Sequence, residues 1–159
     1  MKIEFKNAKP LTDSQIQSIE KLSGVILPSE IRHFYLHFAG AKPGINNGDA
    51  CFKITLDDGD EIESFLEDVY DYDSLVEYFE NNNGQYDFIS EYVQHFDLSP
   101  EYVDCATLLP IVALPNGAVY ASVSGIHRGK IYTVDSGDFG IVYLSANLTQ
   151  FLDSVYSCA

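Results

Sequence analysis

The chain has 159 residues, of which 46% are hydrophobic, and its formal net charge at pH 7 is −15. This length and composition favour one folded domain over residues 1–159, with a hydrophobic core of its own. Because 24 Asp and Glu stand against nine Lys and Arg, we expect binding neither to nucleic acid nor to an anionic membrane surface, since both need a basic footprint.

Residues 11–40 have the features of two helices joined by a tight elbow. Thr12 suits an N-cap, and Gln15 three residues later completes a capping box. Gly24 suits the left-handed residue that ends the first helix, and Pro28 suits the first turn of the second. The second helix is predicted from an apolar stripe at helical spacing, which Gly40 ends: Ile31, Phe34, Tyr35 and Phe38.

The next part of the chain predicts a loop and a hairpin. Residues 41–49 are rich in Pro, Gly and Asn, which is typical of a loop. Alternating apolar residues predict a strand over residues 51–56, and residues 57–60 predict a hairpin turn. A return strand is expected over residues 61–66.

Residues 66–105 predict a helical insertion that is strongly acidic. One helix is expected from about residue 73, a second apolar stripe runs over residues 89–96, and a short third helix is expected to begin near Pro100.

From residue 108 the pattern changes to short β-rich segments. Strands are predicted over residues 108–114, 118–123, 130–134 and 140–144, and a helix over residues 147–155 closes the chain. The expected fold is therefore α+β: an N-terminal helix pair packed on a mostly antiparallel sheet, a helical acidic insertion and a closing C-terminal helix.

The cysteines and the N-terminus both favour a cytoplasmic protein. Cys51, Cys105 and Cys158 are odd in number and widely spaced, which predicts no disulfide framework and suits a reducing cytosol. Residues 1–10 lack the apolar region of a signal peptide, and no apolar run approaches the roughly 20 residues that span a bilayer.

Residues of the types used in catalysis do not form a catalytic pattern. His33 and His37 have the i, i+4 spacing of metal ligands, but Phe34 stands where a zincin helix has its Glu, and two ligands do not complete a zinc site. The run from Asp57 to Glu61 lacks the spacing of a calcium loop. We therefore predict a non-enzymatic protein with no catalytic residues, no metal site and no cofactor.

The N-terminal pattern resembles the SUKH superfamily, the Smi/Knr-type domain. The resemblance lies in Glu20, Gly24, the pair Leu27-Pro28 and Gly40, and it returns at the other end of the chain in Leu109-Pro110, Gly117, residues 129–132 and the closing helix. Many domains of this superfamily are immunity proteins that bind a cognate bacterial toxin domain, often a basic nuclease. Others, in fungi, regulate cell-wall synthesis. The resemblance thus implies a protein-binding role.

The acidic segment is the part of the sequence that bears on a partner. Sixteen Asp and Glu and six Tyr lie between residues 57 and 104, and residues 54–127 contain no Lys or Arg. Solvated helix faces over packed tyrosines would explain this, but ordinary surfaces mix both signs. The alternative is a field that attracts a cationic partner, with tyrosines as anchors.

The sequence and the resemblance together predict an immunity protein that blocks a cognate, basic toxin domain by covering its active cleft with an acidic surface. We expect a monomer or a weakly associating homodimer; the alternative is a regulatory scaffold for cellular proteins. The residues expected to contact the partner are Asp57, Asp58, Asp60, Glu61, Glu63, Glu67, Asp68, Tyr70, Asp71, Tyr72 and Asp73.

Overall fold

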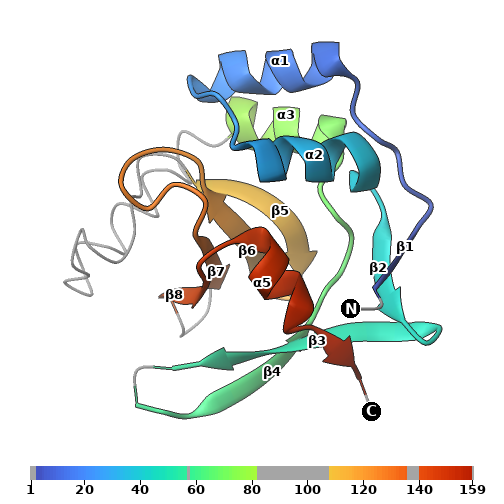
Figure 1. The fold of residues 1–159 in the computed structure, drawn as a ribbon, viewed down its shortest axis with the longest axis vertical. Coiled ribbons are helices and arrows are strands. Elements are labelled where there is room, and N and C mark those ends of the chain that lie inside the picture. The colour runs from blue at the N-terminus through green and yellow to red at the C-terminus, as the bar shows by residue number, and fades with distance from the viewer. Residues whose placement is uncertain (1–2, 57, 82–107, 136–139, 159) are drawn as a thin grey trace.

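The computed structural model describes residues 3–56, 58–81, 108–135 and 140–158. In these ranges the chain forms four helices and two antiparallel sheets (Figure 1), which confirms the expected α+β class. The helices are α1 (Asp13–Ser23), α2 (Ser29–Phe38), α3 (Tyr72–Asn81) and α5 (Leu148–Asp153). None of the described helices is long and apolar enough to cross a membrane.

The first sheet has the order β1-β2-β3-β4, and a short C-terminal strand, β9, also pairs with β3. Its strands are β1 (Glu4–Lys6), β2 (Lys42–Ile45), β3 (Gly48–Thr55), β4 (Glu61–Phe65) and β9 (Tyr156–Ser157). The second sheet has the order β5-β6-β7-β8. Its strands are β5 (Leu108–Leu114), β6 (Gly117–Ser122), β7 (Ile131–Asp135) and β8 (Gly140–Ser145).

The capped first helix forms as its sequence predicts. The Thr12 hydroxyl accepts a hydrogen bond from the Gln15 backbone N–H at 3.2 Å, and the Gln15 side chain accepts one from the Thr12 N–H at 3.0 Å. Gly24 ends the helix with φ of 76°, a conformation that suits a residue without a Cβ.

Glu20 shapes the elbow between α1 and α2. Its carboxylate is 9% exposed, accepts a hydrogen bond from the Leu27 N–H at 2.8 Å and pairs with Arg32 at 2.8 Å. A buried N–H without a partner would cost about 1–3 kcal/mol, so Glu20 makes the turn compatible with burial of Leu27.

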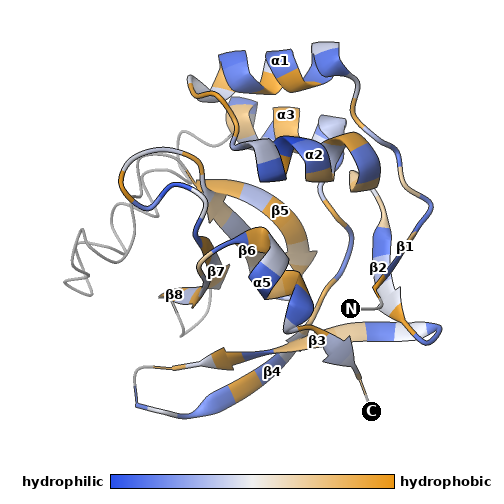
Figure 2. Cartoon of the chain, in the orientation of Figure 1, coloured by the Kyte–Doolittle hydropathy of each residue, from blue (hydrophilic) through white to orange (hydrophobic). Residues whose placement is uncertain are grey.

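The hydrophobic core joins the helices to both sheets. Ile16 and Ile31 from the helices share one cluster with Phe52 of β3 and Leu109 of β5. The Tyr35 hydroxyl donates to the Pro110 carbonyl at 2.5 Å, which ties α2 to β5. Figure 2 shows hydrophobic positions along β5 and on parts of the helices, whereas β4 alternates hydrophilic and hydrophobic residues.

The prediction of a loop over residues 41–49 is wrong for most of this segment. Residues 42–45 form β2, which pairs with both β1 and β3. Asn46 and Asn47 have φ of 53° and 62° and make the tight turn into β3. Pairing on both sides and burial of Pro43 and Ile45 outweigh the loop-like composition of this segment.

The prediction of no disulfide framework is wrong for two of the three cysteines. Cys51 of β3 and Cys158 form a disulfide across a sequence separation of 107, with Cα atoms 5.3 Å apart. Pairing of β9 with β3 brings the two residues together, which the linear spacing does not reveal. Since disulfides persist in oxidising compartments, cysteine usage no longer supports a reducing cytosol.

The remaining elements follow the predicted order. The hairpin of β3 and β4, the helix near residue 73, the four strands from residue 108 and the closing helix are all present, with ends shifted by a few residues. The predicted helical stripe over residues 89–96 and the helix near Pro100 lie outside the described residues.

Candidate partner-binding surface

The acidic residues of the β3–β4 hairpin point into solvent. Asp58 and Asp60 lie in the turn, and Glu61 and Glu63 lie on β4, and all four side chains are exposed. The Asp58 carboxylate accepts a hydrogen bond from the Asp60 N–H at 2.9 Å, which stabilises the turn. We call these four residues the hairpin group; Asp57 lies outside the described residues.

Strand β4 presents its acids on one face because side chains alternate along a strand. Glu61, Glu63 and Phe65 share the outer face of the first sheet, and Ile62 and Ser64 face the other way and are half-buried. Lys53 of β3 lies 3.3 Å from Glu61, and both side chains are more than half exposed. Such an exposed pair contributes about 0–1 kcal/mol and leaves the acids hydrated.

Tyr156 extends this face from the C-terminal strand. Its hydroxyl donates a hydrogen bond to Glu63 at 2.5 Å. This hydrogen bond, more than the nearby charges, raises the pKa of Tyr156 to about 12. Sequence reasoning missed Tyr156 because it stands 93 positions from Glu63 and outside the acidic segment.

A second set of acids lies where the chain runs from β4 to α3. The Glu67 N–H donates to the Ala113 carbonyl oxygen at 2.8 Å, and the Asp68 backbone carbonyl accepts from the Ala113 N–H at 2.9 Å. These bonds fasten the connection to β5. We call the following residues the α3 group: Glu67, Asp68, Tyr70, Asp71, Tyr72 and Asp73.

Asp71 is the N-cap of α3. Its carboxylate accepts a hydrogen bond from the Ser74 N–H at 2.8 Å. Partial burial raises the pKa of Asp71, but hydrogen bonds from Ser74 and the charge of Lys9 outweigh burial and lower the pKa below its ordinary value. Asp71 therefore stays ionised at neutral pH.

A shallow pocket opens beside this cap. Its volume is about 260 Å³, and its lining joins residues before and within α1 to the start of α3. The lining residues are Lys9, Pro10, Gln15, Asp71, Tyr72 and Asp73. One lysine and two carboxylates share this pocket, so Lys9 compensates only part of its negative charge.

The two tyrosines of the α3 group are half-buried. Both pack against the main hydrophobic core, and Tyr70 also packs against a second, smaller cluster that includes Tyr78 and Leu108. Burial raises the pKa of Tyr70, as expected for a hydroxyl held partly out of water. Only the outer parts of these rings are available to a partner.

The structure does not gather all the predicted residues into one patch. The β3–β4 hairpin lies at the lower end of the molecule in Figure 1, and α3 lies in its upper part, joined to β4 by a long connection. The hairpin group is therefore separated from Asp71, Tyr72 and Asp73 at the start of α3, whereas Glu67 and Asp68 follow directly after β4.

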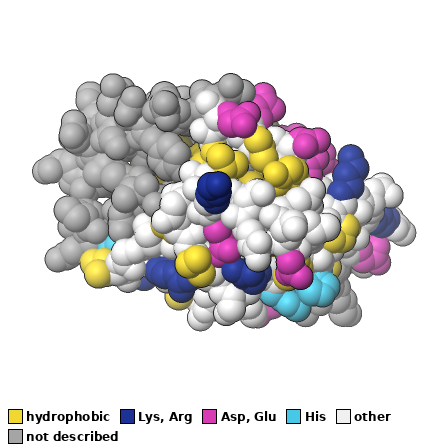
Figure 3. Space-filling view, turned by 90° about the horizontal axis from the view of Figure 1, so that it is seen from above, with side chains coloured by type: hydrophobic (Ala, Val, Ile, Leu, Met, Phe, Trp, Pro, Cys, Tyr) yellow, Lys and Arg dark blue, Asp and Glu magenta, His cyan; other side chains and the backbone are white. Residues whose placement is uncertain are grey.

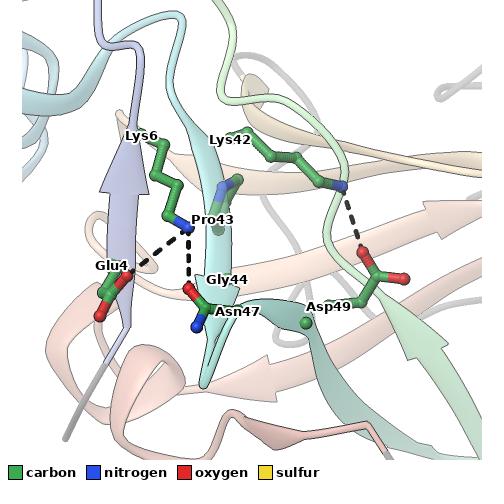
Figure 4. A pocket seen from close by; sticks show the side chains of 8 residues that line it. Glu4, Lys6, Lys42, Pro43, Gly44, Asn47 and Asp49 are labelled. Atoms are coloured by element: carbon green, nitrogen blue, oxygen red, sulfur yellow. Dashed lines mark hydrogen bonds and ion pairs between the residues drawn. The ribbon is translucent and has the colours of Figure 1, made fainter.

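Elsewhere the first sheet balances its charges. A pocket of about 360 Å³ on β1, β2 and β3 contains Lys6, which pairs with Glu4 at 3.8 Å, and Lys42, which pairs with Asp49 at 3.7 Å (Figure 4). The face that carries the helices also mixes Lys and Arg with Asp and Glu (Figure 3). The excess of acid on the first sheet is thus found at β4.

The histidines do not assemble a metal site in the described residues. His33 and His37 are both exposed, and His37 Nδ1 lies 2.8 Å from the His33 carbonyl oxygen. Within the described ranges no three His, Cys, Asp or Glu side chains are placed to hold a metal ion.

Comparison with known proteins gives one finding. The family model described as SMI1 / KNR4 family (SUKH-1) matches residues 10–154. Among curated proteins, none matches this chain. The matched region includes the elbow of Glu20 and Leu27, both acidic groups and the second sheet.

Proposed function

Because the chain belongs to the SMI1/KNR4 (SUKH-1) family, we propose that it is an immunity protein that binds and neutralises a cognate bacterial toxin domain. The toxin domain is basic and of the nuclease type, and the acidic surface covers its active cleft. The observation that carries this proposal is the hairpin group: four exposed carboxylates on one hairpin, of which Glu61 pairs with Lys53, while the other described ion pairs of this sheet join Glu4 to Lys6 and Asp49 to Lys42.

Electrostatics gives the mechanism. A cleft that binds phosphates is lined with cations, and an exposed acidic edge complements it. Complementary fields raise association rates by about 10- to 1000-fold, and salt screens them. Occupation of the cleft by protein then excludes the substrate without any chemistry, so the proposed protein is not an enzyme.

The α3 group enlarges the contact. Asp68 and Asp73 are exposed, and the outer parts of Tyr70 and Tyr72 offer apolar area beside them. We place neutralisation in the cytoplasm of the producing cell, where the toxin is made; this location rests on the family role and not on the cysteines.

A second candidate function follows from the other role found in this family. In it the chain is a non-enzymatic regulatory scaffold that binds cellular proteins. The helical face favours this role, since Lys and Arg are interspersed there with Asp and Glu (Figure 3).

Co-purification from the native cell tests the proposal and separates the two functions. We expect one basic, toxin-like protein to be retained at low salt and weakened at high salt, identified by mass spectrometry. Retention of several signalling or envelope-synthesis proteins would instead establish the scaffold.

Charge reversal locates the surface. The double variant Glu61→Lys/Glu63→Lys is expected to weaken toxin binding at least tenfold, mainly through slower association. The variant Asp13→Lys/Asp153→Lys makes the same change in net charge at exposed positions on α1 and α5 and serves as the matched control. Equal losses in both variants would show that net charge, and not the hairpin group, attracts the toxin.

A further inference from the structure

Strand β4 is an edge strand of the first sheet. It is the last strand in the order β1-β2-β3-β4 and lies at the lower edge of the molecule in Figure 1. An edge strand exposes one row of backbone N–H and C=O groups, and another strand can pair with them.

The register shows which backbone groups lie on that open row. At the two ends of the ladder, the Leu56 N–H donates to the Asp60 carbonyl oxygen at 2.8 Å, and the Leu66 N–H donates to the Ala50 carbonyl oxygen at 2.9 Å. Since hydrogen-bonded and non-hydrogen-bonded pairs alternate in an antiparallel ladder, Ile62 and Ser64 bond to β3. The N–H and C=O groups of the alternate residues therefore point away from β3: Glu61, Glu63 and Phe65.

These outward groups are unused within the described part of the chain. No backbone or side-chain hydrogen bond joins the main chain of Glu61, Glu63 or Phe65 to a described residue beyond the β3 ladder. The same three residues carry their side chains on the outer face. The residues that offer open backbone donors and acceptors are thus the same residues that carry two carboxylates and an aromatic ring on the outer face.

We propose that the open edge of β4 binds an extended, basic segment of the partner protein as an added strand. Residues directly opposite in a sheet place their side chains on the same face. Cationic residues at every second position of the added strand would therefore lie opposite Glu61 and Glu63. An apolar residue, two positions further, would lie against Phe65, which is 37% exposed.

The charges select this occupant over a second copy of the chain. Two β4 edges paired together would oppose carboxylates to carboxylates, and like charges directly across a ladder are destabilising. Acidic residues at an edge strand therefore discourage self-pairing, while the same residues favour a basic strand. Backbone bonds provide affinity and the alternating side chains provide specificity.

This inference rests on the proposed function for the identity of the partner, but a peptide tests the edge by itself. The probe is a ten-residue peptide in which arginine and threonine alternate; the control peptide has the same composition with its arginines grouped. We expect the alternating peptide to bind at least tenfold more tightly, measured by fluorescence anisotropy at fixed salt. Equal affinities would overturn the added strand.

Two variants at one position separate the backbone from the side chain. Glu63→Ala removes the carboxylate and keeps the N–H, whereas Glu63→Pro removes both, and proline is tolerated where an edge N–H faces solvent. We expect the proline variant to bind the alternating peptide about three- to tenfold more weakly than the alanine variant, the loss of about one net hydrogen bond. Unfolding temperatures of both variants control for folding.

Amide hydrogen exchange gives a readout that needs no substitution. On binding the alternating peptide, the amides of Glu61 and Glu63 should gain protection, whereas the Ser64 amide, already bonded to β3, should change little. Peptide binding without this alternation would overturn the inference and leave toxin neutralisation standing. Failure to find a basic toxin in the cell would remove the proposed function without changing the peptide result.

Discussion

Several carboxylates of the acidic surface have a structural partner as well as a charge. Glu63 accepts a hydrogen bond from Tyr156, Asp58 from the Asp60 N–H, and Asp71 from the Ser74 N–H. These hydrogen bonds hold the three carboxylates in defined positions. The same residues therefore stabilise local structure and carry the negative charge of the proposed surface.

Asp71 allows this dual role to be measured. Asp71→Ala removes the cap of α3 and should lower the free energy of unfolding by about 1 kcal/mol at pH 7. Asp71→Asn keeps an oxygen acceptor and should lose much less. Chemical denaturation of the three proteins checks both values.

The stabilisation by Asp71 should depend on pH, because folding lowers the pKa of its carboxyl group. A carboxylate whose pKa is lowered on folding adds stability above its unfolded pKa, near 4, and loses it as the pH falls through the lowered folded value. The stability advantage of the wild type over Asp71→Ala should therefore shrink below about pH 4. The Asn variant, which cannot ionise, should show no such change relative to Ala; a wild-type advantage independent of pH would contradict the assignment.

At the scale of elements, the strand β9 depends on a covalent link. It has two residues, pairs with Ala50 and Cys51, and is followed by the Cys158 N–H bond to Asp49 at 3.2 Å. Two ladder pairs offer little against the entropy of a chain end. The disulfide therefore has a large share in keeping Tyr156 beside Glu63.

Reduction of this disulfide should destabilise the protein. In the chain-entropy account, a cross-link that closes about 107 residues contributes about 4–5 kcal/mol by restricting the unfolded chain. We expect a lower unfolding temperature in reductant, and the same decrease in Cys158→Ser without reductant. Cys105→Ser is the control and should keep the response to reductant; an unfolding temperature unaffected by reductant would contradict the prediction.

The elements that the sequence predicted are those specified by local chemistry. The capping box of Thr12 and Gln15 and the left-handed Gly24 define α1 within a few residues of chain. Strands β2 and β9 were missed because distant pairing defines them: β2 contains Pro43 and Gly44, which indicate a loop until β1 and β3 bond to either side. Local patterns contain no information on such contacts.

The features of the candidate site also fall into those that the local sequence predicts and those that only the tertiary fold determines. The acidic side chains of β4 are visible in the sequence, and period-two alternation places Glu61 and Glu63 on one face. The open edge and the hydrogen bond from Tyr156 come from the order of strands in the sheet, and the separation of the hairpin group from the start of α3 comes from the fold as a whole. Composition reveals that the chain is acidic, but not where its charge is left uncompensated.

At the scale of the whole molecule, a net charge of −15 should make stability depend on salt. Mutual repulsion destabilises the compact state, and raising the ionic strength from 0.01 M to 0.15 M shortens the Debye length from about 30 Å to about 8 Å. Repulsion acts over long distances, whereas pairs such as Lys53 and Glu61, at 3.3 Å, are screened less. We expect sodium chloride over this range to raise the free energy of unfolding by about 1 kcal/mol, or the unfolding temperature by a few degrees.

The variant Glu61→Lys/Glu63→Lys, with a formal net charge four units less negative, should show a smaller rise. A decrease of the unfolding temperature with salt would mean that the attractive pairs outweigh the repulsion, and that the acidic edge costs the fold nothing.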